Sequence, residues 1–132
     1  MDRDTCRSMS RKVRLTARDG AYVVALAVFE TNLVREALRV ITQLQISPDR
    51  MLVQFGFAKA ELAELAERLT PAVTTGAELA VTHRELRMIY LVLRQVPEMF
   101  GTEEDFHLRL GFYTEQARGL AAALLAAVDR TA

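Results

Sequence analysis

Apolar residues spaced alternately three and four apart are the feature of this chain that most limits its fold, because this spacing keeps them on one face of an α-helix. Four segments show the pattern, at residues 16–45, 47–69, 79–96 and 102–129. Each segment is long enough to form several helical turns. We therefore predict four helices.

The residues between these segments are typical of helix ends. Ser47 and Pro48 suit the N-cap and the first position of a helix, Pro71 and Gly76 interrupt the chain, and Pro97 ends the third segment. Short connections of this kind favour antiparallel neighbours. We predict a single-domain, all-α, antiparallel up-down four-helix bundle over residues 16–132. Residues 1–15 lack periodicity and are predicted to be a disordered or frayed tail.

A β-hairpin is the alternative for residues 13–29. Asp19-Gly20 is a turn signal, and strand-compatible residues lie on both sides of it. Gly56 could likewise break the second helix. We prefer the helix because the three-four spacing continues downstream of Gly20 for about six turns.

Composition bounds the class of protein. The chain has 132 residues, of which 51% are hydrophobic, enough for one substantial core. Seventeen basic side chains balance seventeen acidic ones, so no positive field attracts nucleic acid or an anionic membrane. The longest apolar runs, residues 21–29 and 120–128, are shorter than the roughly 20 residues of a membrane-spanning helix. We predict no nucleic-acid or membrane partner.

The cellular location is predicted from the N-terminal residues and the cysteine content. The only cysteine, Cys6, excludes an intramolecular disulfide, and the charged N-terminal residues contain no apolar signal segment. Both observations favour the cytoplasm.

Two of the predicted helices carry more apolar surface than a monomeric bundle needs. The first has a second apolar stripe beside its main one, and the fourth has small and apolar residues well away from its core stripe. We predict that this surface forms a two-fold homodimer, although it could instead widen the buried face. The predicted interface residues are Val23, Ala27, Val34, Leu38, Ile41, Leu108, Phe112, Gly119, Ala122 and Ala126.

A metal site is suggested by Glu104-x-x-His107, a pair that di-iron helical bundles use on an inward face. Such a site needs the motif on two helices, and this chain has it once. On the predicted helix, Glu104 points roughly 150° and His107 roughly 90° away from the core direction. Both are therefore weak candidates, and we predict neither a bound metal nor another cofactor.

Residues 56–69, GFAKAELAELAERL, resemble the first helices of a helix-turn-helix repressor, which would imply DNA binding. A short turn and a polar recognition helix should follow. Instead the connector is longer, and residues 86–96 are too apolar to lie in a groove.

Catalysis has no support in the sequence. The serines and threonines stand mainly at helix starts, and no glycine-rich phosphate loop is present. We therefore predict a non-catalytic interaction or regulatory module that self-associates through its first and fourth helices. The alternative is a helical bundle that senses a small molecule or binds a metal, since aromatic and methionine side chains are common in the expected core.

Overall fold

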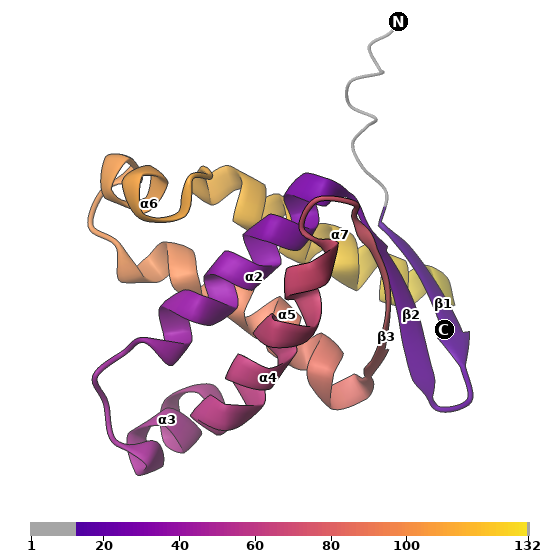
Figure 1. Ribbon diagram of the computed structural model, residues 1–132, viewed down its shortest axis with the longest axis horizontal. Coiled ribbons are helices and arrows are strands. Elements are labelled where there is room, and N and C mark those ends of the chain that lie inside the picture. The colour runs from indigo at the N-terminus through magenta and orange to yellow at the C-terminus, as the bar shows by residue number, and fades with distance from the viewer. Residues whose placement is uncertain (1–12, 132) are drawn as a thin grey trace, which may run out of the picture.

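The computed structural model describes residues 13–131, which form three strands and six α-helices (Figure 1). The prediction of an all-α four-helix bundle is wrong, because a three-stranded antiparallel sheet is part of the fold. In chain order the elements are β1 (Arg14–Arg18), β2 (Ala21–Leu26), α2 (Val28–Thr42), α3 (Pro48–Phe55), α4 (Lys59–Leu69), β3 (Ala77–Thr82), α5 (His83–Gln95), α6 (Glu103–Leu110) and α7 (Thr114–Thr131). Two 3₁₀ turns, Thr70–Ala72 and Val96–Met99, follow α4 and α5.

The hairpin of β1 and β2 replaces the first half of the predicted first helix. Asp19 and Gly20 have φ angles of 50° and 78° and join strands that pair Arg18 with Ala21. Two consecutive residues with positive φ form a type I′ turn, whose twist matches that of the flanking strands. The Asp-Gly signal therefore identified the hairpin correctly, and α2 begins only at Val28.

The N-terminal boundary also differs from the predicted tail of residues 1–15. Residues 1–12, including Cys6, lie outside the described part of the chain. Val13 is buried and β1 begins at Arg14, so residues 13–15 of the predicted tail are part of the fold.

The third strand comes from the start of the predicted third helix. β3 pairs antiparallel with β2, which places β2 in the centre of the sheet. Because side chains alternate along a strand, Leu15, Val24 and Leu79 share one face. That face packs against the hydrophobic core, and the helices lie to this side of the sheet (Figure 1).

Both edges of the sheet are partly capped by side chains. Arg68 on α4 donates to the carbonyl oxygen of Ala80 in β3 at 2.7 Å. On the β1 edge, Arg130 donates to Val13 O at 3.0 Å and Thr131 donates to Leu15 O at 3.1 Å. These bonds occupy carbonyl groups that would otherwise be open to pairing with another strand.

Two glycines divide predicted helices into pairs of shorter ones. Gly56 and Gly111 have φ angles of 84° and 82° and end α3 and α6 in the left-handed region. This conformation is accessible to glycine without a steric penalty and commonly ends a helix. The predicted helices at 47–69 and 102–129 are therefore α3 with α4, and α6 with α7.

The core surrounds α2, which packs against α4 and α5. Leu33, Val34, Leu38 and Ile41 on α2 have no exposed surface, so the helix is covered on more than one side. Within the described residues, every helix is too short or too polar to cross a lipid bilayer.

Candidate functional site

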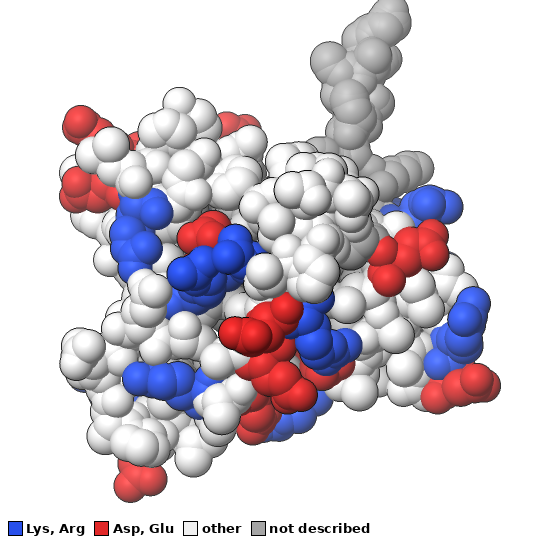
Figure 2. All heavy atoms as spheres, in the orientation of Figure 1, with Lys and Arg blue, Asp and Glu red and all other residues white. Residues whose placement is uncertain are grey.

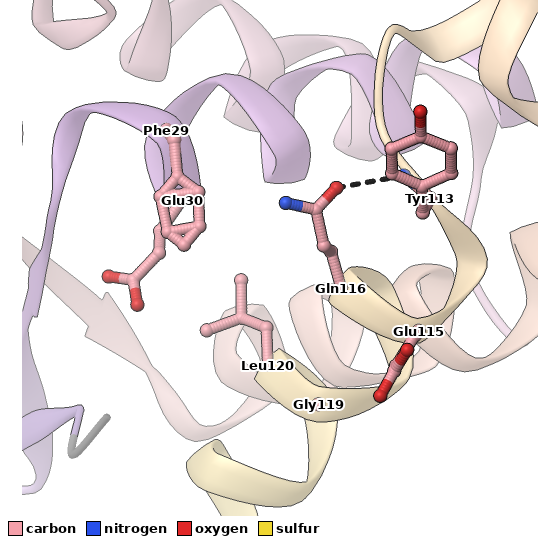
Figure 3. A pocket seen from close by; sticks show the side chains of 7 residues that line it. All are labelled: Phe29, Glu30, Tyr113, Glu115, Gln116, Gly119 and Leu120. Carbon is pink, nitrogen blue, oxygen red and sulfur yellow. Dashed lines mark hydrogen bonds between the residues drawn. The ribbon is translucent and has the colours of Figure 1, made fainter. Parts of the chain in front are cut away.

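A groove with a volume of about 510 Å³ lies between the start of α2 and the first half of α7 (Figure 3). Its lining residues are Phe29, Glu30, Tyr113, Glu115, Gln116, Gly119 and Leu120. The volume falls within the range of small-molecule sites. Two large apolar side chains at the groove remain solvent-accessible, since Phe29 is 39% and Tyr113 is 51% exposed.

The first turn of α2 fixes one wall of the groove. Glu30 Oε1 accepts a hydrogen bond of 2.8 Å from the backbone N–H of Ala27, which satisfies a donor at the helix start. This hydrogen bond holds the Glu30 side chain against the protein, and Glu30 is only 9% exposed. Its carboxylate lines the groove beside Phe29.

The first turn of α7 fixes the opposite wall. Gln116 Oε1 accepts a hydrogen bond of 2.8 Å from the backbone N–H of Tyr113, so its amide nitrogen turns toward the groove (Figure 3). Leu120, one turn further on, points toward α2 and is largely buried. The groove thus combines an apolar floor with polar groups held by helix-start hydrogen bonds.

The break between α6 and α7 is stabilised by Glu103. Its two carboxylate oxygens accept hydrogen bonds from Thr114, at 2.6 Å from the hydroxyl and 2.9 Å from the backbone N–H. These bonds, the hydroxyl bond first, hold the pKa of Glu103 below its usual range. Glu103 therefore ties the start of α6 to the start of α7.

The metal candidates do not gather into a site. Glu104 is exposed in the first turn of α6. His107 is half-buried and stacks on Tyr113, with ring centroids 4.3 Å apart and an angle of 7° between the planes, and its Nδ1 is buried without a hydrogen-bond partner. Among residues 13–131, no three His, Cys, Asp or Glu side chains are grouped so that they could hold a metal ion.

The predicted interface residues fall into three sets by burial. Val34, Leu38 and Ile41 are completely buried, so in this conformation they have no surface to offer a second copy. Val23 is half-buried on the outer face of the sheet and Phe112 is half-buried beside the core. The exposed members are Ala27, Leu108, Gly119, Ala122 and Ala126.

The outer face of α7 gathers most of the exposed apolar residues from the prediction. Gly119, Ala122 and Ala126 lie there beside Leu125, which is 48% exposed and was not predicted. Arg118 and Asp129 stand on the same face toward either end of the helix, and both are exposed; Arg118 also forms a solvent-exposed ion pair with Glu98 at 3.5 Å. The predicted interface contained apolar and small residues only, so it left out Arg118 and Asp129; it also left out Leu125, although that residue is apolar.

Charged residues elsewhere pair across elements and leave basic and acidic groups interspersed on the side shown in Figure 2. Arg84 on α5 contacts both carboxylate oxygens of Glu61 on α4, at 2.9 and 3.2 Å. This hydrogen-bonded pair lowers the pKa of Glu61 and raises the pKa of Arg84. Both groups are solvent-accessible, so the pair contributes little stability.

The segment that resembles a helix-turn-helix does not form that motif here. α4 is followed by a 3₁₀ turn and then by β3, where a recognition helix would be required. No protein family, curated protein or solved structure matches the chain.

Proposed function

We propose that this chain is a non-catalytic interaction module that self-associates, with a second copy packing against the exposed face of α7. The observation that carries the proposal is the pattern Arg118, Ala122, Leu125, Asp129 on that face. The steps of four, three and four residues keep these side chains within about 60° around the helix axis. They form a narrow stripe of the kind that pairs helices.

The stripe is complementary to itself when two copies of α7 lie antiparallel. A two-fold axis between Ala122 and Leu125 places Arg118 opposite Asp129 of the partner subunit, and the symmetry repeats this pair. Ala122 then faces Leu125 of the partner subunit in the centre. The antiparallel arrangement also brings each helix dipole beside the opposite end of its neighbour.

Small side chains support a close approach of the two helices. Gly119 and Ala126 flank the stripe, and in the described structure no heavy atom lies within 4 Å of a Cβ added at Gly119, apart from its own helix backbone and chain neighbours. One helix pair is a small interface, so we expect dissociation in the micromolar range.

A cytoplasmic location is part of the same proposal, supported by a cysteine content that permits no intramolecular disulfide.

Light scattering across a wide protein concentration range tests the proposal. The mass is expected to rise from the 14.8 kDa of one chain toward twice that value. Ala122→Glu should keep the chain monomeric, because two carboxylates would meet near the centre of the interface. Ala60→Glu on the exposed side of α4 adds the same charge and serves as control. A constant monomer mass up to high micromolar concentration contradicts the proposal.

A further inference from the structure

The groove between α2 and α7 has a one-sided charge. Among residues 13–131, its lining includes two carboxylates, Glu30 and Glu115, and no lysine, arginine or histidine. Its other large side chains are uncharged, namely Phe29, Tyr113, Leu120 and the amide Gln116 (Figure 3). The site therefore offers negative charge beside apolar surface.

Of the two carboxylates, Glu30 matters more for ligand binding because its side chain is largely buried from water. It is 9% exposed, and no lysine, arginine or histidine of residues 13–131 lies within the 4.0 Å ion-pair distance of its carboxylate. One oxygen accepts the Ala27 N–H, and the positive end of the α2 dipole favours the charge. The other oxygen has capacity for a charge-assisted hydrogen bond.

A second groove of the same protein has basic residues in its lining as well as a carboxylate. Between α2 and α4, a groove of about 370 Å³ has Glu67 in its lining together with Arg35 and Arg39. There the chain supplies cations beside the carboxylate. In the α2–α7 groove, the lining residues that the structure describes supply none.

We propose that the α2–α7 groove binds a small organic cation, namely a protonated primary amine on an aromatic or aliphatic body. The ammonium group donates to the Glu30 carboxylate, and the apolar body packs against Phe29 and Leu120. The partly exposed ring of Phe29, next to Glu30 in the chain, adds attraction for a nearby cation. This binding site goes beyond the self-association proposed above.

Titration of the full-length, isotope-labelled chain with 2-phenylethylammonium, followed by NMR, tests this site. We expect saturable shifts of the backbone amides of residues 29–30 and 113–120. The matched probes are 2-phenylethanol, which is neutral, and phenylacetate, which is anionic. Both should bind at least about tenfold more weakly, because the charge-assisted bond to Glu30 is lost.

Glu30→Gln is the decisive variant, since glutamine keeps an oxygen that can accept the Ala27 N–H and preserve the helix start. It should weaken 2-phenylethylammonium binding about tenfold and leave 2-phenylethanol binding unchanged. Glu67→Gln removes the same charge from the α2–α4 groove and should change neither. A thermal melt of each variant confirms that the fold is intact.

Equal binding of the amine and the alcohol, or an undiminished affinity in Glu30→Gln, would overturn the proposal. Shifts confined to other parts of the chain would also overturn it. The titration is repeated on Ala122→Glu, the variant expected to stay monomeric. Amine binding should persist there, which separates this site from the self-association of α7.

Discussion

Thr82 and Glu85 cap the first turn of α5 reciprocally. Thr82 Oγ1 accepts a hydrogen bond of 3.0 Å from the backbone N–H of Glu85, and Glu85 Oε1 accepts one of 3.0 Å from the backbone N–H of Thr82. The two bonds satisfy backbone donors at the point where β3 ends and the helix begins. The capping box thus sets the boundary between the sheet and α5.

Thr82→Ala should lower the free energy of unfolding by about 1 kcal/mol, because the Glu85 N–H loses its side-chain acceptor. Thr82→Ser keeps the hydroxyl and should retain most of the stability. Urea denaturation of the three proteins measures the difference. Equal stability of the alanine and serine variants would show that the cap is unimportant.

Gly76 allows the chain to pass close to Leu26 at the start of β3. Its φ is 78°, and a Cβ at this position would lie 2.9 Å from the backbone oxygen of Leu26. Gly76→Ala should therefore destabilise the fold by about 1–3 kcal/mol.

Gly119→Ala is the matched comparison and should have the opposite sign. Gly119 is an exposed helical residue with open space at its Cβ, so alanine should raise stability by about 0.5–1 kcal/mol. Denaturation at low protein concentration keeps self-association out of this comparison. A stabilising Gly76→Ala would contradict the geometry at Leu26.

The bonds from Thr114 predict a pH dependence at Glu103. Its pKa is lowered on folding, so its contribution to stability is present above the unfolded pKa and is lost as the pH falls through the folded pKa. Thr114→Val removes the hydroxyl donor and keeps the backbone N–H. The pKa of Glu103, followed by carboxyl NMR, should rise in this variant toward its ordinary value. An unchanged pKa would mean that the hydroxyl bond is not its cause.

The sequence predicted most helical segments correctly but not the sheet. Asp19-Gly20 is a local hairpin signal, but the three-four spacing of apolar residues downstream of it favoured a helix. β3 has no comparable signal, since its sequence, AELAVT, is compatible with a helix. It becomes a strand because β2 presents a partner edge, and such long-range pairing cannot be read from local propensity.

The candidate site was predictable only in part. The exposed small residues of α7 were found because Gly119, Ala122 and Ala126 share a helix face. The groove between α2 and α7 was not predicted, because it depends on the start of α2 at Val28 and on the break between α6 and α7 at Gly111. The burial of Leu38 and Ile41 likewise follows from the packing of α4 and α5 around α2.

Sedimentation equilibrium of charge-reversed variants tests the central claim, self-association through antiparallel α7 helices, most directly. Arg118→Asp and Asp129→Arg each place like charges opposite one another twice in the dimer, and each should weaken it about tenfold. The double variant restores opposite charges and should recover the wild-type dissociation constant. Arg94→Asp on α5 is the control for the charge change. Failure of the double variant to recover association, or single variants that dimerise like the wild type, would contradict the claim.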